Sequence, residues 1–559
     1  MKLALIAVVF AVFAPSCWAA GGTCPTSANY TNPSTGAQVT LASLGVTSCF
    51  YIAASGSDAS NGTSEATPWL HAPGMTGCTG TCSSASIAAG EGFILRGGDT
   101  YHFSGRGTPV GLPWTWTHSG NSGSPIYLGV DRTWFSAASW ARPVFTGDNP
   151  TSTSTVGSCA HADDGETFLS SSVNNVIVDN FEATGFCWAT GNGLNIFDGG
   201  SSNFTSWTNN YIHGWTRQSS CTGSGCGQSP QGFFTSNGAV TCPGGAGCSD
   251  TYTLNVVDGA DTEGDVFTAI QWQCYNVYGN VFRFVANIVC NIHNVHDNWL
   301  DNFNESPTSD HGNTWEENTE ITGVGANAWY NNLVTNNNTA VQIWLAPPPG
   351  NTVYVFNNII YGAKANAQGN YFNVGDNTNN YGTYNVFNNT FENPNNGAII
   401  QCQETAHLKT INLVNNFYIN NSSPYAANPC PSANGGGNSP APLTELTLSH
   451  SLATSDGYVA SQVYAYSPTS SSNPTVGAGT NETSGFCSAL SGNAATACTQ
   501  DASYACTYNS VNHTVSCPAR TPNPRPGNGA GNWDIGGYAF GSSSSSKPNP
   551  PTNLSVAVQ

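Results

Sequence analysis

The feature that most constrains the fold of this chain is an Asn-Asn dipeptide that recurs through its middle. The copies are Asn209-Asn210, Asn331-Asn332, Asn357-Asn358, Asn388-Asn389 and Asn415-Asn416. The second Asn advances from position 332 to 358, 389 and 416, in steps of 26, 31 and 27 residues, and Asn180 precedes Asn210 by 30. A step of this length is typical of one turn of a solenoid.

The repeating unit is predicted to be built of β-strands. It is rich in Val, Ile, Tyr, Phe and Thr, and few strong helix formers intervene. Asn tolerates the left-handed backbone of a tight corner, and stacked Asn amides can hydrogen-bond along the stack. In residues 173–181 we expect Val176 and Val178 to face inward, and Ile177 and Asp179 to face outward. The sequence therefore predicts an all-β parallel β-helix, with any chemistry on its outer face.

Composition limits the classes of partner. Only 8% of the 559 residues are charged and 62 are Gly, so a polar surface replaces the usual charged one. A solenoid grows by adding turns, so we expect one long domain over residues 50–541. We also expect a monomer, although the sequence leaves the oligomeric state open. The formal net charge of −20, with only 12 Lys plus Arg, argues against nucleic acid and against an anionic membrane as partner.

The first 20 residues are typical of a secretory signal. A Lys at position 2 precedes an apolar run over 3–13, and small residues precede a cleavage point after Ala19 or Ala20. A lipoprotein anchor at Cys17 is the alternative, although residues 14–16 form a poor acceptor motif. Later segments lack 18 uninterrupted apolar residues. We therefore expect a secreted, extracellular or cell-surface protein without membrane insertion.

Removal of the signal would leave 18 cysteines, an even number that suits an oxidising compartment. Local disulfides between sequence neighbours would pin loops and adjacent turns, although the sequence leaves their connectivity open. The neighbours are Cys24 and Cys49, Cys78 and Cys82, Cys159 and Cys187, Cys221 and Cys226, Cys242 and Cys248, Cys274 and Cys290, Cys402 and Cys430, Cys487 and Cys498, and Cys506 and Cys517. A metal site at Cys78 and Cys82 is the alternative, but no second pair completes it.

Three motifs resemble a known group of proteins. Residues 51–58, with Asn61-Gly62-Thr63 and Thr67-Pro68-Trp69, resemble the opening of secreted bacterial right-handed parallel β-helix proteins of the pectate-lyase-like superfamily. Residues 93–101 resemble their first full turn, and 532–538 resemble their closing D-I-G-A-Y segment, with Gly537 where Ala is usual. The resemblance covers roughly residues 50–540 and implies a right-handed β-helix. Its motifs mark the fold and name no substrate.

Three segments outside the regular repeat are predicted to form an extension, a loop and a linker. Residues 21–49 are predicted to form an N-terminal extension. The Cys- and Gly-rich residues 218–250 interrupt the repeat and are predicted to project as a binding loop. Residues 542–559 are predicted to be a Ser/Pro linker, in which 551–558 resemble the first strand of a fibronectin-type III module that is not completed.

Ionisable residues are dense over residues 293–317 for a chain with so few charges. Adjacent turns of a β-helix lie ~4.8 Å apart, so outward carboxylates one or two turns apart suit the ~5–5.5 Å or ~6.5–9.5 Å separations of glycosidases. We therefore predict catalytic chemistry in this segment. The predicted catalytic residues are Asp297, Asp301, Asp310 and His311.

Aromatic and basic residues near this segment are predicted to bind substrate. An indole offers a flat face to a sugar ring, and a guanidinium binds carboxylates or hydroxyls. The predicted substrate-binding residues are Arg283, His296, Trp299, Trp315 and Trp344. The structural alternative is that the Asp and His side chains bond to local backbone, and that the Trp side chains fill the core.

A second acidic segment is a candidate calcium site through clustered carboxylate oxygens, although its spacing is not that of an EF-hand. Its residues are Asp258, Asp261, Glu263 and Asp265. The sequence requires no other cofactor.

These features predict a carbohydrate-active protein that acts on an extracellular polysaccharide, as a glycoside hydrolase or a polysaccharide lyase. A lyase uses a basic residue and often calcium, and the predicted turns carry few Lys and Arg residues. A protein of net charge −20 also repels a polyanion, which favours hydrolysis of a neutral glycan. Two non-catalytic alternatives remain open: a glycan-binding adhesin, and a disulfide-stapled spacer.

Overall fold

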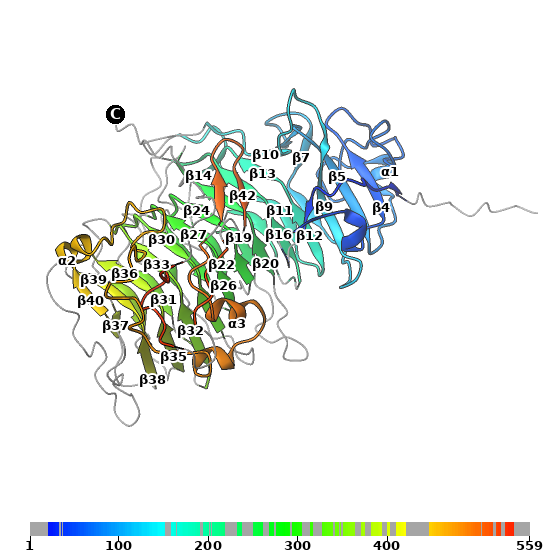
Figure 1. Cartoon of the computed structure of the whole chain (residues 1–559). Coiled ribbons are helices and arrows are strands. Elements are labelled where there is room, and N and C mark those ends of the chain that lie inside the picture. Colours follow the sequence, from blue (N-terminus) through cyan, green and yellow to red (C-terminus); the bar gives the residue numbers. More distant parts are fainter. Residues whose placement is uncertain are drawn as a thin grey trace, which may run out of the picture.

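The chain folds as a right-handed parallel β-helix of three long sheets, as the computed structural model shows (Figure 1). The structure describes residues 21–541 except 33–34, 36, 151–157, 164, 190–193, 201, 203, 219–231, 237–249, 261–267, 273–275, 291–292, 304–312, 317–326, 339–340, 346, 348–349, 364–369, 375–381, 394–399, 403–409, 421–445, 505, 518–520 and 527–530. Neighbouring strands of the three sheets pair in parallel, apart from β1 (Gly22–Thr23), which pairs antiparallel with β4 (Ser48–Ile52).

Each turn contributes one strand to each sheet over most of the coil. After β1 and β4, the first sheet continues through β5 (Glu91–Gly97), β9 (Ile126–Phe135), β12 (Val176–Asp179), β16 (Ser206–Thr208), β20 (Thr251–Thr253), β23 (Asn276–Tyr278), β26 (Asn294–His296), β29 (Asn327–Tyr330), β32 (Thr352–Phe356), β35 (Thr383–Phe387) and β38 (Thr410–Val414). The second sheet contains β7 (Val110–Leu112), β6 (Thr100–Phe103), β10 (Val144–Thr146), β13 (Glu182–Thr184), β17 (Tyr211–His213), β21 (Val256–Asp258), β24 (Val281–Arg283), β27 (Trp299–Asp301), β30 (Leu333–Thr335), β33 (Ile359–Tyr361), β36 (Thr390–Asn393), β39 (Phe417–Asn420) and β40 (Leu446–Ser449). The third sheet contains β8 (Trp114–Trp116), β11 (Thr167–Ser171), β15 (Asn195–Asp198), β19 (Gly232–Ser236), β22 (Thr268–Trp272), β25 (Asn287–Cys290), β28 (Asn313–Glu316), β31 (Val341–Leu345), β34 (Asn370–Val374) and β37 (Ile400–Cys402).

The remaining described elements are short. They are the two-stranded sheets β14 (Phe186–Trp188) with β18 (Trp215–Arg217), β2 (Tyr30–Thr31) with β3 (Gln38–Val39), and β41 (Thr507–Asn509) with β42 (Thr514–Ser516), the α-helices α1 (Gly80–Ser83), α2 (His450–Ser455) and α3 (Gly492–Cys498), and the 3-10 helices η1 (Leu41–Leu44) and η3 (Phe486–Ala489). None of these described helices has the length and apolar run that a bilayer crossing requires.

The strands alternate between the core and the outside, as the sequence predicts. In β12, Val176 and Val178 belong to the main core cluster. Ile177 lies outside the coil, where the N-terminal segment buries it beside Leu41. The core therefore fills the inside of the coil, and outward residues remain available for other contacts.

Asn side chains form a continuous ladder inside the corner between the first and second sheets. Along the ladder, each Oδ1 accepts bonds of 2.9–3.2 Å from the backbone N–H and the side-chain amide of the preceding ladder residue. The ladder residues are fully buried and are Asn210, Asn255, Asn280, Asn298, Asn332, Asn358, Asn389 and Asn416. This arrangement confirms the predicted stack of amides and satisfies polar groups that would be costly to bury alone.

The residue before each ladder position has a left-handed backbone. It is Asn in the recurring dipeptides, with φ of 54–58°. Three turns that lack the dipeptide use Leu254, Gly279 and Asp297 instead, with φ of 56°, 68° and 56°. Asn180, with φ of 63°, also takes this first position, so it corresponds to Asn209 and not to Asn210. The corner therefore continues through turns in which the sequence shows no Asn-Asn pair.

The coil also continues through residues 218–250, the range predicted to form a projecting loop. Within it, β19 is a strand of the third sheet and pairs with β15 and β22. Most other residues of this range lie outside the described residues. The range therefore contains a strand of the coil.

Both terminal segments pack on the outside of the first and second sheets. Residues from Cys24 to Val46 cover one end of the first sheet. The C-terminal segment, which includes α3 and β42, crosses the side of the coil (Figure 1). It covers the other end of the first sheet and a large part of the second. In the described part of the chain, these clusters of terminal residues contain no residue of the third sheet.

Five disulfides confirm five of the predicted local pairs, and they suit an oxidising compartment. They join Cys24 to Cys49, Cys78 to Cys82, Cys159 to Cys187, Cys487 to Cys498, and Cys506 to Cys517. Each of the other four predicted pairs includes a residue outside the described ones.

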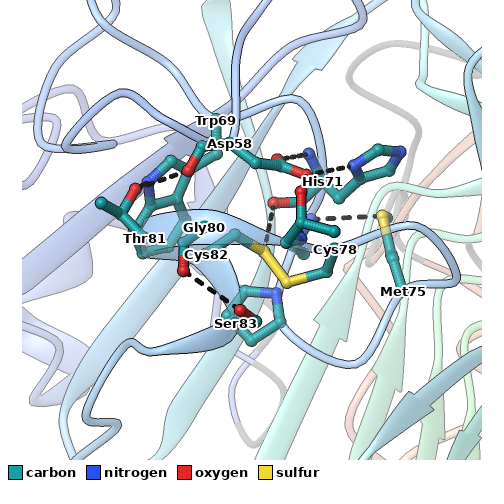
Figure 2. Close-up of a disulfide and its surroundings, with 12 residues drawn as sticks. Asp58, Trp69, His71, Met75, Cys78, Gly80, Thr81, Cys82 and Ser83 are labelled. Carbon is teal, nitrogen blue, oxygen red and sulfur yellow. Dashed lines mark hydrogen bonds and ion pairs between the residues drawn. A yellow bond between two sulfur atoms is a disulfide. The ribbon is translucent and has the colours of Figure 1, made fainter.

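Residues 58–82, between β4 and β5, are organised around the buried carboxylate of Asp58. Figure 2 shows Asp58 beside His71 and the Cys78–Cys82 disulfide. Asp58 Oδ2 lies 2.7 Å from His71 Nδ1, and Asp58 Oδ1 accepts the backbone N–H groups of Leu70 and His71. Because the two sulfur atoms are bonded to each other, this pair does not form the metal site that its spacing allowed.

Candidate functional site

The third sheet has an outer face on which no described terminal segment packs. Its inward residues, such as Phe197, Ile288 and Ile343, lie in the main core. Alternate residues in the strands face outward. We use the term outer row for the outward positions that continue one another in register from strand to strand.

The outer row crosses the whole third sheet. Among the side chains that the structure describes, the row contains Thr115, Ser170, Asp198, Glu316 and Trp344. Backbone pairing continues the same register through positions 235, 271, 289, 373 and 401. Neighbouring strands lie ~4.8 Å apart. The described side chains of the row are hydroxyl, carboxylate and indole groups, which is chemistry that recognises sugars.

Glu316 and Trp344 are direct neighbours in this row, on β28 and β31. Trp344 is half-buried, whereas Glu316 is 2% exposed. The Asn313 amide donates a 2.8 Å hydrogen bond to Glu316 Oε2, so the carboxyl group has a fixed position. An indole beside an oriented carboxyl group can combine stacking with proton transfer.

His296 and Asp297, both predicted site residues, lie at the corner between the first and second sheets. His296 Nδ1 lies 2.6 Å from Asp297 Oδ2, and the imidazole stacks on Tyr278 and Tyr330 at centroid distances of 4.8 and 4.7 Å. Ser503 donates a 2.6 Å hydrogen bond to Asp297 Oδ1. The C-terminal segment therefore contacts this pair directly, and its contacts fix the corner.

Arg283 and Asp301 form a buried network with Asp258. Arg283 Nη1 donates to Asp258 at 2.9 Å, and its Nε donates to Asp301 at 3.2 Å. Asp301 is fully buried and also accepts bonds from Thr335 and Asn336. Burial acts to lower the pKa of the Arg283 guanidinium, but the negative charges of Asp258 and Asp301 outweigh this effect and raise the pKa. Contrary to the expectation of an outer-face site, these groups are bound to one another inside the fold.

Trp299 and Trp315 are also covered. The Trp299 ring lies 5.3 Å from the Arg283 guanidinium and packs under the hairpin of β41 and β42. Trp315 is 0% exposed and belongs to the main core, because it occupies an inward position of β28. Of the three tryptophans predicted to meet a sugar ring, Trp344 has an outward position and partial exposure.

Asp258, the first residue of the predicted calcium site, is hydrogen-bonded to other protein groups. Asp258 accepts bonds from Arg283 and from the Tyr508 hydroxyl, each 2.9 Å long. Asp261, Glu263 and Asp265 lie outside the described residues. Among the residues that the structure describes, no group of three or more His, Cys, Asp or Glu is placed to hold a metal ion. Calcium binding here stays a prediction from sequence.

The four predicted catalytic residues do not share one described groove. Asp297 and Asp301 belong to the corner and the second sheet. Asp310 and His311 lie outside the described residues, but in sequence they closely precede β28, the strand that carries Glu316. Among the described residues of 293–317, Asp297 and Asp301 therefore lie on one side of the coil and Glu316 on another.

A further polar cluster lies at the edge of the hairpin of β41 and β42. His213 Nε2 lies 2.9 Å from Glu182 Oε1, and both side chains are partly exposed. The Tyr211 ring stacks on His213 and on His513, with both centroid distances at 4.1 Å. This cluster joins two turns of the coil to a hairpin some 300 residues later, so a sequence pattern does not reveal it.

The outer row as a unit was not predicted from the sequence. Its carboxylates, Asp198 and Glu316, are far apart in the chain, and the connections between third-sheet strands vary in length. The repeat is regular at the Asn corner but not at the third sheet. An alternation signal in residues 313–316, where Trp315 faces in and Glu316 faces out, was the available clue.

Comparison with known proteins gives distant structural likenesses. The pectate lyase Pel9A is 14% identical, with a TM-score of 0.34, and the match covers 78% of this chain and 92% of that one. The PL6 family alginate lyase AlyGC is 13% identical, with a TM-score of 0.38 and coverage of 60% and 42%. The GH136 lacto-N-biosidase from Eubacterium ramulus is 12% identical, with a TM-score of 0.34 and coverage of 72% and 68%. No protein-family model and no curated protein matches the sequence. At these values the likenesses do not assign an activity to this chain.

Proposed function

We propose that this chain is a secreted carbohydrate-active protein that binds an extracellular polysaccharide along the outer row and cleaves it beside Trp344. One observation carries the proposal. The outer row is an in-register line of polar and aromatic positions on the one long sheet that no described terminal segment covers. The predicted signal over residues 1–20 and the five disulfides support export.

The charge of the row supports a neutral glycan as the substrate class. The row contains Asp198 and Glu316 but no Lys or Arg. A polymer of uronates would meet these carboxylates without a cation in the row, on a protein of net charge −20. A neutral sugar chain instead offers hydroxyl groups to hydrogen-bonding side chains and ring faces to Trp344.

Glycoside hydrolysis is the reaction that this arrangement supports best. In the proposed step, the Glu316 carboxyl group gives its proton to the leaving glycosidic oxygen as the C–O bond breaks. A water molecule adds to the anomeric carbon and loses its proton to a second acidic or imidazole group. Asp310 and His311 are proposed for that second role because they closely precede β28 in sequence.

Binding without cleavage is the second candidate function. Glu316 is 2% exposed and hydrogen-bonded to Asn313. This arrangement suits a structural carboxylate that stabilises the strand as well as it suits a catalytic acid. In that case Trp344 and the polar positions would bind a glycan that the protein does not cut. The same experiment separates the two functions.

The test is a screen of the purified protein against neutral and acidic polysaccharides from plants, algae and bacteria. Binding is measured by affinity electrophoresis, hydrolysis by new reducing ends, and elimination by ultraviolet absorbance of unsaturated uronates. We expect binding and new reducing ends with a neutral polysaccharide, and loss of both in Trp344→Ala. The matched control is Phe135→Ala, because Phe135 is 36% exposed at the end of β9, away from the outer row.

Each result has a defined meaning. Binding without new reducing ends selects the glycan-binding function over the enzyme. Unsaturated products from an acidic polysaccharide overturn the assignment to a neutral substrate. Equal binding by Trp344→Ala and wild type contradicts the use of the outer row.

A further inference from the structure

Phe204 is an exposed aromatic residue held in a strained backbone conformation. It lies between β15 and β16, in the connection from the third sheet to the first, with φ of 61°. It is 51% exposed. Single exposed apolar residues are common, but a left-handed backbone is unfavourable for a bulky side chain. Leu254 has a similar φ of 56° but is 5% exposed and packs against the C-terminal hairpin, whereas the Phe204 ring is exposed. Exposure of a strained aromatic residue is the feature that calls for a functional explanation.

The preceding turn shows that a less strained residue suits this position. Ile177 pairs with Ser206, so the register places Asn175 opposite Phe204. Asn175 has nearly the same conformation, with φ of 55°. Asn adopts this conformation more readily than an aromatic residue does. The corner itself therefore does not require Phe.

Buried hydrogen bonds on both sides fix the backbone of Phe204. Asp250 is 2% exposed and accepts a 2.8 Å bond from the Ser202 hydroxyl and a 3.1 Å bond from the Thr205 N–H. The start of the same connection is tied to the outer row, because the Gly200 N–H donates to Asp198 Oδ1 at 2.8 Å. The exposed ring therefore lies between two residues, Ser202 and Thr205, that are both bonded to the buried Asp250.

We infer that Phe204, in the connection that follows Asp198 of the row, is a second aromatic platform for the glycan besides Trp344. This inference rests on the proposed function. Five inter-strand steps separate β15 from β31, through β19, β22, β25 and β28. At ~4.8 Å a step, the two aromatic residues are roughly 24 Å apart along the coil axis. The site would then bind several consecutive sugar units, with an aromatic ring at each end.

Two aromatic platforms predict a dependence of affinity on glycan length. A short oligosaccharide reaches Trp344 alone, whereas a longer one also reaches Phe204. Stacking on an aromatic ring supports a gain of about tenfold in affinity for the longer oligosaccharides. Phe204 would then set the length preference of the site.

The test uses calorimetric titration with cello-oligosaccharides and xylo-oligosaccharides of increasing length. The informative variant is Phe204→Asn, because Asn suits the left-handed backbone and the fold should keep or gain thermal stability. We expect this variant to lose about tenfold in affinity for the longest oligosaccharides and to bind the shortest ones unchanged. Trp344→Ala should weaken binding at every length, and Phe135→Ala at none.

The outcomes separate this inference from the function on which it rests. If Phe204→Asn binds the longest oligosaccharides as tightly as the wild type while Trp344→Ala does not, the inference is overturned and the proposed function stands. If the wild type binds neither series but binds another neutral polysaccharide of the screen, the titration uses oligosaccharides of that polysaccharide, with the same expected results. If the wild type binds no neutral polysaccharide, the neutral-glycan assignment fails and the inference fails with it. A large loss of thermal stability in Phe204→Asn would show that Phe204 is needed by the fold, which also overturns the inference.

Discussion

Tyr508 donates a hydrogen bond of 2.9 Å to Asp258, a residue 250 positions earlier in the chain. The same hydroxyl lies 2.8 Å from His513 Nδ1. Asp258 also accepts a bond from Arg283, which in turn contacts Asp301. One hydroxyl group therefore joins the C-terminal hairpin to the buried ion pairs of the second sheet.

Replacing this hydroxyl should destabilise the protein. Tyr508→Phe leaves a buried carboxylate without one of its donors, so we expect the free energy of unfolding to fall by ~2 kcal/mol. The measurement is urea unfolding followed by tryptophan fluorescence. The matched control is Tyr101→Phe, because the Tyr101 hydroxyl is buried and has no hydrogen-bond partner among the described residues. Equal losses in the two variants would show that the bond to Asp258 contributes nothing.

The Asn ladder should be sensitive to the loss of one member. Asn358→Ala removes the acceptor of two bonds from Asn332 and the donor to the Trp329 carbonyl, all inside the fold. We expect a loss of ~3 kcal/mol in unfolding free energy. The control is Asn388→Gly, which deletes a buried amide with no partner among the described residues at a φ of 56° that Gly accepts. If both variants lose the same stability, the ladder bonds are not the cause.

The hairpin should lose stability as the solution becomes acidic. Burial lowers the pKa of His513, with Asp258 and Glu182 opposing this effect and His213 and Arg142 adding to it. Because the folded state disfavours the charged imidazole, the unfolded state binds more protons below its pKa of about 6.5. The stability contributed by the neutral His513 is therefore complete at higher pH, and it is lost as the pH falls through about 6.5 toward the lower pKa of the folded state.

The measurement compares unfolding free energies between about pH 5 and pH 7.5. His513→Gln should reduce the slope of stability against pH in this range. His102→Gln is the control at a His residue outside the hairpin, where His102 Nδ1 lies 2.8 Å from Asp148. A slope that is unchanged in His513→Gln would exclude His513 as its source.

Replacing the proposed acid, Glu316, should impair cleavage without impairing glycan binding. Glu316→Gln keeps the size of the side chain but cannot donate a carboxyl proton, so cleavage should fall by about 100-fold or more while glycan binding persists. The readouts are reducing-end release and affinity electrophoresis on the same polysaccharide. Glu65→Gln, at an exposed carboxylate between β4 and β5 and outside the row, should retain cleavage. Full cleavage by Glu316→Gln would remove this residue from the mechanism.

The sequence by itself determined the β-helix, the Asn corner between its first and second sheets, and its local disulfides. The spacing of the Asn pairs predicted one turn per repeat, and the alternation at Val176 and Val178 predicted which residues face the core. Five of the predicted disulfides join sequence neighbours, as expected. These features depend on short stretches of chain, so local residue types decide them.

Tertiary structure alone decided which outward residues are accessible. Asp297 faces away from the core as a corner residue should, yet Ser503 lies on it, more than 200 positions later. Asp301 lies in a strand whose outer side is closed by residues near Tyr508. Exposure of an outward side chain depends on which remote segment packs over it, and a local repeat contains no information about that packing. The third sheet therefore became the candidate surface only when the fold showed where residues 24–46 and the segment with α3 and β42 pack.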